Sequence, residues 1–295
     1  MAAGLFHDRR RFLAAGGASL FAAPRATAAA VVDDVVRTIA AIKADIGGRV
    51  GVAALDTRSG VWLRHRADER FAMASAFKVL LAATVLLSVD RSELELRRLI
   101  PFSRADLLEY APRARAHVDR GAMSVLDLCA AAVEVSDNTA ANLLLGLVGG
   151  PPGFTAGLRK LGDATARLDR TEPTLNTNLP GDVRDTSSPT AFVLTLRRVL
   201  LGDRLSTESR RQLTAWMVNC QTGLARLRAG LPAGWKAGDK TGTGENGAVN
   251  DVAIVWPPGR PPILIAALLS GSKRSTQELS AAHARIGRAV VGAFS

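Results

Sequence analysis

The sequence predicts an α+β fold in which a five-stranded antiparallel sheet, built from the N- and C-terminal parts of the chain, is flanked by helices. Three observations predict it. β-rich runs lie near both ends of the 295-residue chain, the signals between them are mainly helical, and a helical segment closes the chain. The simplest arrangement of such elements inserts an all-α domain into the sheet domain. Clefts at domain junctions are favoured binding sites, so we expect the functional site there.

The first segment, residues 1–28, has the composition of an export signal. Arg9-Arg10-Arg11-Phe12-Leu13 precedes a stretch rich in Ala, Gly and Leu, and Ala26-Thr27-Ala28 ends it. A basic start, a short apolar core and an A-x-A site form a secretory signal, and paired arginines are typical of the twin-arginine type. We expect cleavage after Ala28 and a periplasmic location. No later apolar run is long enough to span a bilayer, so we expect no membrane attachment of the mature form.

Two stretches, residues 29–67 and 217–295, are expected to form the α/β domain. In the first stretch, residues 31–46 have the apolar spacing of a helix. The runs 49–55 and 61–65 are rich in β-forming residues and flank a short turn sequence, so they predict a hairpin.

The C-terminal stretch is expected to supply the remaining strands. Strand character returns after Trp235. Two further β-rich runs, 252–256 and 263–269, are separated by Pro-Pro-Gly-Arg-Pro-Pro, which is a strong turn signal. Residues 276–291 have helical spacing and close the chain.

The middle of the chain, residues 68–216, is expected to form the inserted helical domain. Ser124 is a plausible N-cap of one helix, and Ser188-Pro189 begins another that Gly202 ends. The polar segment 167–188 has no clear periodicity, and a loop of that length inside a compact domain is usually functional.

Composition excludes several classes of function. The net charge is +11, but the arginines are scattered and no basic run is interleaved with aromatic residues, which argues against nucleic-acid binding. Two cysteines and four scattered histidines give no metal-ligand spacing, so we expect no metal and no cofactor. Cys129 lies in an apolar helical pattern, which favours a buried free thiol over a disulfide with Cys220.

Four fragments carry residue types suited to catalysis. The first, Ser75-Ala-Phe-Lys78, places a hydroxyl and an amine one helical turn apart on one face. A serine becomes a nucleophile only when a base removes its proton, and a lysine can act as a base only if its surroundings lower its pKa.

The second and third fragments have both a catalytic and a structural interpretation. In Ser136-Asp137-Asn138, a hydroxyl can pass a proton to a leaving group and an amide can orient a carbonyl, although all three residues also favour helix caps. In the predicted strand Lys240-Thr241-Gly242-Thr243, a cation and hydroxyls can bind a carboxylate, and the glycine lets a ligand approach the backbone. The structural alternative is a polar strand edge with a bulge.

The fourth fragment lies in the polar segment 167–188. Glu172 can act as a general base on a water molecule, and Asn176 can hold that water. Arg170 and Asp185 can pair across the segment and fix its shape. Taken alone, the fragment is more typical of a solvated charged loop.

Together and in this order, the four fragments resemble those of the class A β-lactamases, which are serine enzymes that hydrolyse penicillins. The resemblance runs from about Val31 to the C-terminus. It includes Glu109-Tyr110-Ala111-Pro112, Leu161-Gly162-Asp163, Arg184-Asp185-Thr186 and Arg228-Ala229-Gly230-Leu231-Pro232.

The resemblance implies a role for each matched residue. Ser75 would be the nucleophile and Lys78 a base or organiser of hydrogen bonds, while Ser136 would relay a proton to the departing nitrogen. Glu172, with Asn176, would activate the water that releases the acyl group. The remaining matches would bind substrate: Asn138, Lys240, Thr241, Gly242 and Thr243. Whether Lys78 or Glu172 removes the proton from Ser75 is left open.

The sequence departs from the family pattern at one substrate-binding position. Many members carry an arginine on the strand after Lys-Thr-Gly, where this chain has Val249. In other members an arginine just before Arg-Ala-Gly-Leu-Pro has the same role instead, and Arg226 matches that position. The resemblance therefore implies that Arg226 binds the substrate carboxylate and that Tyr110 walls the cleft.

Two other activities share part of this pattern. A D-Ala-D-Ala peptidase carries the first three motifs, and a non-hydrolysing β-lactam sensor is acylated without turnover. Glu172 with Asn176 favours a hydrolase, because a group that drives deacylation is what both of these relatives lack. We expect a monomer whose partner is a small β-lactam molecule.

Overall fold

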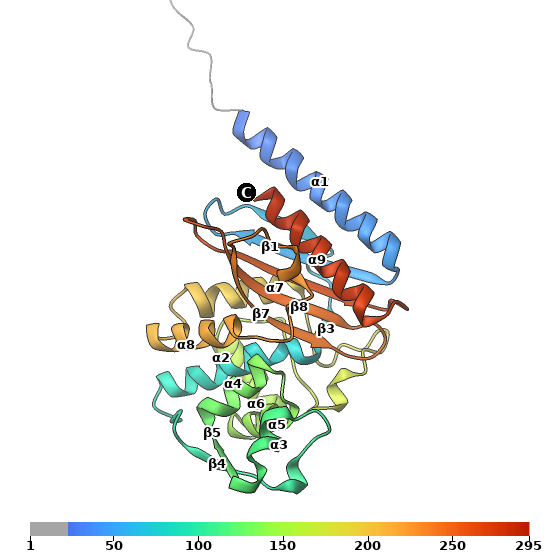
Figure 1. Ribbon diagram of the computed structural model, residues 1–295. Helices are drawn as coiled ribbons and strands as arrows, with labels where there is room; N and C mark the ends of the chain where they lie inside the picture. Colours follow the sequence, from blue (N-terminus) through green and yellow to red (C-terminus); the bar gives the residue numbers. More distant parts are fainter. Residues whose placement is uncertain (1–22, 295) are drawn as a thin grey trace, which may run out of the picture.

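The computed structural model describes residues 23–294, and its centre is a five-stranded antiparallel sheet (Figure 1). The strands lie in the order β2-β1-β9-β8-β7. Their bounds are β1 Arg49–Asp56, β2 Trp62–His65, β7 Lys236–Thr243, β8 Val249–Trp256 and β9 Ile263–Ser270. The predicted fold class is confirmed, and β8 begins three residues before the run that the sequence indicates.

The sheet joins the two ends of the chain through one long ladder. β1 pairs with β9 along its whole length, from Arg49 opposite Ser270 to Asp56 opposite Ile263. β9 is buried at every position, which explains its uninterrupted apolar sequence, because both of its faces are covered. The hairpin between β1 and β2 is present as predicted.

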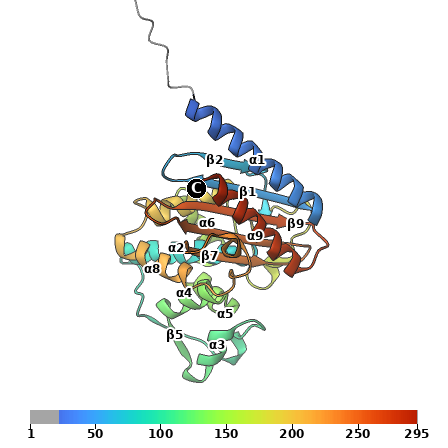
Figure 2. The same ribbon diagram turned by 45° about the horizontal axis from the view of Figure 1, so that its top comes forward.

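Helices cover both faces of the sheet. On one face, α1 (Ala23–Ile46) and α9 (Thr276–Ala293) lie side by side and share a core with alternate residues of the strands (Figures 1 and 2). The opposite face packs on α7 (Pro189–Leu196) and on the helical region. Because successive strand residues point to opposite faces, Val52 and Ala54 belong to the first core and Ala53 and Leu55 to the second.

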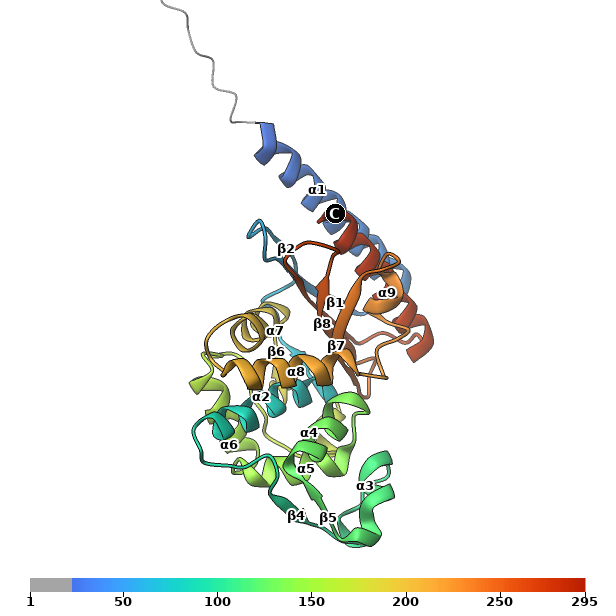
Figure 3. The ribbon, with the colours of Figure 1, turned by 60° about the vertical axis from the view of Figure 1, so that its left-hand side comes forward.

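The helical region below the sheet is built around one buried helix (Figure 3). This helix, α2 (Phe77–Asp90), has ten consecutive buried residues and contacts helices on several sides, and its Phe77 ring meets the Phe154 ring edge-on at 5.9 Å. The helices of this region are α3 Pro112–His117, α4 Val125–Glu134, α5 Asn138–Leu147, α6 Gly150–Lys160 and α8 Thr207–Val218.

The predicted helix ends are confirmed at two caps. The Ser124 hydroxyl accepts a hydrogen bond from the backbone of Asp127 at the start of α4, and Ser188 caps α7 in the same way. A π-helical segment, Arg197–Leu201, extends α7 as far as Gly202. Two small antiparallel pairs were not predicted: β3 (Phe71–Ala72) with β6 (Thr186–Ser187), and β4 (Leu99–Pro101) with β5 (Ala122–Ser124).

The predicted export signal lies mostly outside the described residues. Within them, α1 begins at Ala23, so the expected cleavage point after Ala28 falls inside its backbone helix. No helix in residues 23–294 is both long and apolar enough to cross a membrane.

Candidate active site

The nucleophile candidate sits in a 3₁₀ turn, Ala74–Ala76, that leads directly into α2. Ala74 has φ +42°, a left-handed conformation that costs a residue with a Cβ about 1–2 kcal/mol. Such strain is typical of functional turns. The turn and the first residues of α2 bring the Lys78 ammonium to 2.9 Å from Ser75 Oγ, so the two residues meet as the sequence predicts.

Lys78 is completely buried and is surrounded by oxygen atoms. Besides Ser75 Oγ, it donates to the Ser136 carbonyl at 2.8 Å and to Asn138 Oδ1 at 2.5 Å. Its nitrogen also lies 3.0 Å from Glu172 Oε1. Burial lowers the pKa of Lys78, and the Glu172 carboxylate opposes that shift. A lysine placed in this way can exchange a proton with either serine.

The Ser-Asp-Asn fragment forms the bend between α4 and α5, and its three residues divide their roles. Asp137 is the structural residue, because its carboxylate caps α5 at Ala140 and accepts backbone hydrogen bonds from Arg113 and Ala114 at the start of α3. Ser136, with φ +61°, and Asn138 are left pointing at the Lys78 ammonium. The helix-cap interpretation therefore holds for Asp137 alone.

The Lys-Thr-Gly fragment lies at the inner end of β7. The buried Lys240 ammonium donates to Ser136 Oγ at 3.1 Å and to the Thr241 carbonyl at 2.7 Å. Burial lowers the pKa of Lys240 to about 8, and the Lys78 cation adds to the shift. The ammonium groups of Lys78 and Lys240 thus both contact the Ser136 hydroxyl.

Gly242 allows β7 to pack directly against the Ser75 turn. A Cβ at this position would lie 2.5 Å from the Met73 carbonyl oxygen and 2.9 Å from the Ala76 nitrogen, closer than real contacts allow. The sequence interpretation assigned this space to a ligand, but the protein's own backbone occupies it. The glycine fixes the distance between the nucleophile turn and the strand.

Glu172 reaches the site from the polar segment 167–188. Its Oε1 accepts a hydrogen bond from Ser75 Oγ at 3.1 Å, and its Oε2 accepts one from Asn176 Nδ2 at 2.6 Å. The Glu172 side chain has no exposed surface. The sequence grouping of Glu172 with Asn176 is therefore present in space, next to the nucleophile.

The segment that carries Glu172 is braced from within. Arg170 Nε donates to Asp185 Oδ2 at 2.5 Å, which confirms the predicted pair, and Arg170 Nη1 donates to Thr177 Oγ1 at 3.0 Å. The other oxygen of Asp185 accepts hydrogen bonds from the backbone of Asp169 and Arg170. The buried Asp185 carboxylate thus ties both ends of the segment together.

Arg226 closes the wall of the site beside β7. It is 5 % exposed and donates to the carbonyls of Gly242 and Asn250 and to Thr243 Oγ1, at 2.9, 2.6 and 2.6 Å. Its guanidinium is thus fixed beside a hydroxyl predicted to bind the substrate carboxylate. Thr222, which the sequence reasoning missed, shares a 2.5 Å hydrogen bond with Thr241 on the same wall.

These elements enclose a cavity of about 310 Å³. Tyr110 stands at its mouth with 51 % of its surface exposed, whereas Lys78, Glu172 and Lys240 lie beneath its surface. The lining residues are Ser75, Tyr110, Ser136, Asn138, Asn176, Thr222, Arg226, Thr241 and Thr243. The structure therefore brings the predicted site residues, which lie far apart in the sequence, to a single cleft.

Comparison with known proteins agrees with this geometry. A model of the β-lactamase enzyme family matches residues 34–294. Beta-lactamase AST-1 of Nocardia asteroides is 47% identical over 97% of this chain and 96% of its own length. This chain belongs to the class A β-lactamase family. Beta-lactamase L2 of Stenotrophomonas maltophilia is 45% identical over 95% of the chain.

Solved structures give the same family. An ancestral (GNCA) class A β-lactamase superposes with a TM-score of 0.86 at 51% identity, covering 88% of this chain and all of that one. The putative class A β-lactamase PenP from Rhodopseudomonas palustris superposes with a TM-score of 0.86 at 48% identity. The family resemblance read from the sequence is therefore confirmed.

The sequence reasoning missed two asparagines that support the site of this β-lactamase. Asn142 hydrogen-bonds the backbone of Glu172. It lies one helical turn after Asn138 on α5, and that spacing was an available signal. Asn250 donates to the carbonyls of Ala72 and Met73, just before the nucleophile turn. Its role depends on β8 lying beside that turn, which no local pattern reveals.

A buried carboxyl pair behind β7 was also missed. Asp239 and Asp251 lie two register positions apart on neighbouring strands, and one buried oxygen of each, Asp239 Oδ2 and Asp251 Oδ1, has no hydrogen-bond donor within the described residues. Their outer oxygens accept from Arg228 Nε at 2.5 Å and from the Leu227 backbone at 3.0 Å. Burial raises the pKa of both carboxyl groups. One proton between the two unpartnered oxygens would give both of them a hydrogen bond, and we infer that the pair shares one.

The described residues contain no cluster of metal-ligating side chains, and both of their cysteines are buried. Within residues 23–294, no group of three or more His, Cys, Asp or Glu side chains could hold a metal ion. Cys129 and Cys220 are buried free thiols, as expected for Cys129, and burial raises the pKa of both.

Proposed function

We propose that this β-lactamase opens the β-lactam ring of penicillins and cephalosporins through a serine acyl-enzyme, and that it thereby confers antibiotic resistance. The names of its relatives support this function. The observation that carries it is the Glu172 carboxylate, buried 3.1 Å from Ser75 Oγ and held by Asn176. A peptidase or a sensor has no need of a carboxylate in that place.

In the acylation step, Ser75 Oγ attacks the lactam carbonyl carbon and the C–N bond breaks. Two groups lie within hydrogen-bond distance to accept the serine proton: Lys78 at 2.9 Å and Glu172 at 3.1 Å. The departing nitrogen takes a proton from Ser136, whose hydroxyl is contacted by Lys78 and Lys240. The backbone N–H groups of Ser75 and Thr243 form the oxyanion hole, where one lost donor costs about 3–4 kcal/mol.

Substrate recognition uses the wall opposite Glu172. The hydroxyls of Thr241 and Thr243 bind the substrate carboxylate, and the Arg226 guanidinium and the Lys240 ammonium supply the positive field. The Asn138 side chain binds the amide of the acyl substituent, and Tyr110 walls the entrance. All of these groups line or back the same cavity.

In the deacylation step, a water molecule held by Glu172 and Asn176 attacks the ester carbonyl. Glu172 takes a proton from the water as the new C–O bond forms, and it returns that proton to the Ser75 oxygen, 3.1 Å away, as the ester C–O bond breaks. The product is the ring-opened acid, and the free enzyme is restored.

The decisive experiment replaces Glu172 with Gln. The variant should still form a covalent adduct with benzylpenicillin, seen by mass spectrometry, while deacylation slows by roughly 10²–10⁴-fold, the usual contribution of a general base. Ser75→Ala is the matched control and should form no adduct. Undiminished steady-state turnover by Glu172→Gln would refute the mechanism.

The cellular context belongs to the same proposal. We propose that residues 1–28 direct twin-arginine export, and that the mature enzyme is a periplasmic monomer that does not associate with the membrane. Its α/β part comprises 29–67 and 217–295, and its helical part 68–216. The Arg-Arg-Phe-Leu and A-x-A patterns support the export signal. N-terminal sequencing of periplasmic protein tests it, with Ala29 as the expected first residue and Met1 as the contrary result.

A further inference from the structure

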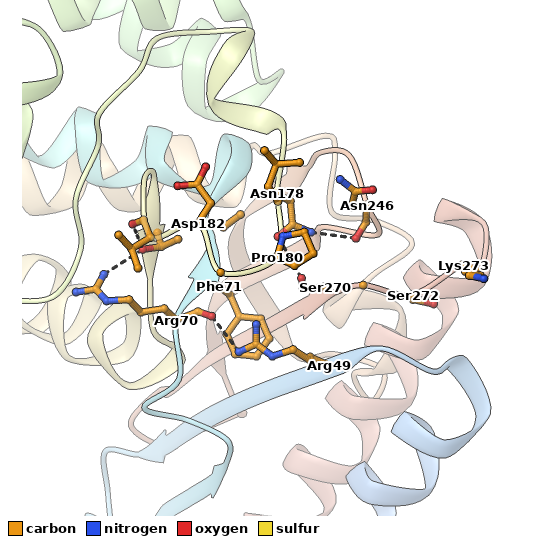
Figure 4. A pocket seen from close by; sticks show the side chains of 16 residues that line it. Arg49, Arg70, Phe71, Asn178, Pro180, Asp182, Asn246, Ser270, Ser272 and Lys273 are labelled. Atoms are coloured by element: carbon orange, nitrogen blue, oxygen red, sulfur yellow. Dashed lines mark hydrogen bonds between the residues drawn. The ribbon is translucent and has the colours of Figure 1, made fainter.

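The short strand that leads into the nucleophile turn is anchored in the core. β3 carries Phe71, whose side chain is 1 % exposed, with the Arg49 guanidinium 4.4 Å from the centroid of its ring (Figure 4). Gly51 on β1 leaves room for the ring, because a Cβ there would lie 2.4 Å from a ring carbon. The chain therefore enters the turn from a fixed point, and the conformation of the turn depends on what holds residues 72–74.

Two groups from distant parts of the chain hold these residues. The Met73 N–H donates to the Asp185 carbonyl at 2.9 Å. From the other side, the Asn250 side chain on β8 donates to the carbonyls of Ala72 and Met73, both at 2.9 Å. The next residue, Ala74, has φ +42°, and strain of this kind persists only where the surrounding structure fixes it. Asn250 is therefore an anchor of a strained turn.

The surroundings of Asn250 require an amide side chain. The side chain is completely buried, and besides the two hydrogen bonds from Nδ2, its Oδ1 accepts one from the Leu269 N–H at 3.3 Å. An amide of this size offers two hydrogens on one atom and an acceptor on the other. Gly242, directly opposite on β7, makes room for it, because a Cβ there would lie 3.2 Å from Nδ2. Both ends of this buried side chain are thus paired.

The main chain of Asn250 contacts the wall assigned to the substrate carboxylate. Its carbonyl accepts a hydrogen bond from Arg226 Nη1 at 2.6 Å, and the same nitrogen donates to the Gly242 carbonyl at 2.9 Å. The other terminal nitrogen of Arg226 donates to Thr243 Oγ1 at 2.6 Å. Asn250 therefore holds the Ser75 turn with its side chain and contacts the arginine of the substrate wall with its main chain.

We propose that Asn250 is a positioning residue for acylation, which fixes Ser75 Oγ relative to the substrate held by Arg226. This inference rests on the proposed function. Before acylation the protein alone places Ser75 Oγ against the lactam carbon, and a shift of about 1 Å there can cost roughly 10²-fold in rate. After acylation the ester bond itself holds these two atoms together. Loss of the Asn250 side chain should therefore slow acylation more than deacylation.

The two steps can be read separately in the Glu172→Gln background, where deacylation is slow enough for the adduct to be followed. Formation of the benzylpenicillin adduct, measured by mass spectrometry, reports acylation, and its decay after removal of free drug reports deacylation. Adding Asn250→Ala should slow formation by roughly 10²-fold and leave decay within about threefold. Equal rates of formation with and without Asn250→Ala would overturn the positioning role, whereas no adduct with Asn250 intact would refute the proposed function itself.

Two further variants separate positioning from stability. Thr195→Val removes a buried hydrogen bond, to Asp163 Oδ2 at 2.9 Å, outside the cleft. It should lower Tm and leave adduct formation within twofold. Asn250→Asp keeps the shape, and its buried carboxyl beside two carbonyl oxygens is held protonated, so it retains one of the two donors. Asn250→Asp should slow formation at least fivefold, and it carries the test if Asn250→Ala does not fold. A rate within twofold of the background would contradict the proposal.

A double-mutant cycle with Arg226→Ala tests the link to the substrate wall. Once Arg226 no longer holds the substrate, the placement of the turn relative to that wall matters less. Asn250→Ala should then slow adduct formation by less than about tenfold, instead of roughly 10²-fold. A cost that is the same with and without Arg226 would overturn the link, because Asn250 would then only stabilise the turn.

Discussion

The side chain of Asn142 pairs with both backbone polar groups of Glu172. Its Nδ2 donates to the Glu172 carbonyl at 2.9 Å, and its Oδ1 accepts from the Glu172 N–H at 3.0 Å. The proposed general base lies on a segment with little regular structure, yet its backbone is fixed to α5, whose first residue, Asn138, contacts Lys78. The same helix therefore holds the backbone of Glu172 and contacts the lysine beside Ser75.

Replacing Asn142 with Leu removes both of these hydrogen bonds at nearly constant volume. We expect deacylation to slow more than acylation, so that the acyl-enzyme accumulates and a burst precedes the steady state. Two lost hydrogen bonds at about 1 kcal/mol each should lower Tm by roughly 4–8 °C. Asn219→Leu, at an exposed helix end, is the control and should show neither effect. If acylation and deacylation slowed by the same factor, Asn142 would only support the fold.

The depressed pKa of Lys240 predicts a basic limb in the pH profile. Lys240 is protonated below about pH 8 and loses its charge as the pH rises through that value. In the proposed mechanism the cation helps to bind the substrate carboxylate, so kcat/KM for benzylpenicillin should fall above pH 8. Lys240→Arg keeps the charge and should move that limb upward. A limb that stays at pH 8 in Lys240→Arg would assign it to another group.

The shared proton of Asp239 and Asp251 predicts unequal effects of two substitutions. Asp251→Asn imitates the protonated form, since its amide can donate to Asp239 and its oxygen can still accept from Leu227. This variant should fold and retain activity within about threefold. Asp251→Ala leaves the Leu227 N–H without its acceptor, while Asp239 keeps Arg228, and it should lose roughly 1–3 kcal/mol of stability.

The same pair predicts how the stability of the folded protein changes with pH. In the folded protein the pKa of Asp251 is raised above its value of about 3.8 in the unfolded chain. Such a carboxyl group contributes its full stabilisation at pH values below 3.8. That stabilisation is lost as the pH rises toward the pKa of the folded state. The Asp251→Asn variant does not lose stability in this way, because an amide does not titrate. Its Tm relative to wild type should therefore increase between pH 4 and pH 8, and a constant difference would exclude a shared proton.

Arg226→Ala should act mainly on substrate affinity. The guanidinium lies 2.6 Å from Thr243 Oγ1, on the wall assigned to the substrate carboxylate, so we expect KM for penicillins to rise by about 10- to 100-fold with a smaller change in kcat. Arg210→Ala, on α8, removes an arginine away from the cleft and serves as the control. Unchanged kinetics in Arg226→Ala would leave Arg226 with a structural role only.

Gly242→Ala tests the packing of β7 against the nucleophile turn. The new methyl group would lie 2.5 Å from the Met73 carbonyl oxygen, so either the strand or the turn must shift. A displacement of about 1 Å at reacting groups can cost roughly 10²-fold in rate, and we expect a loss of that size in acylation. Gly146→Ala, on α5 with open space at its Cβ, is the matched change and should leave acylation intact. Normal acylation by Gly242→Ala would show that the turn tolerates displacement.

The sequence predicts those features that depend on neighbours along the chain. Ser124 and Ser188 cap their helices where local chemistry places them, and the β-rich runs become β1, β8 and β9. The catalytic fragments could be recognised because each is a short motif of chemically suited residues. Their convergence on one cleft followed from the family resemblance and not from local pattern.

The features that escaped prediction depend on distant parts of the chain. Asn250 supports the Ser75 turn from a strand 175 residues later, and nothing beside it in sequence indicates that contact. Asp251 looks like a polar strand residue until its register places it near Asp239. Gly242 was assigned to a ligand because the Met73 carbonyl that fills its space lies elsewhere in the sequence.

The ladder between β1 and β9 has a consequence for biosynthesis. Residues 49–56 leave the ribosome early but find their partners only in residues 263–270, so the central sheet cannot close until nearly the whole polypeptide has been made. Until then β1 has an unpaired edge that is open to aggregation. Translation that stops before residue 263 should therefore yield insoluble fragments, because folding of the sheet depends on completing the last strand.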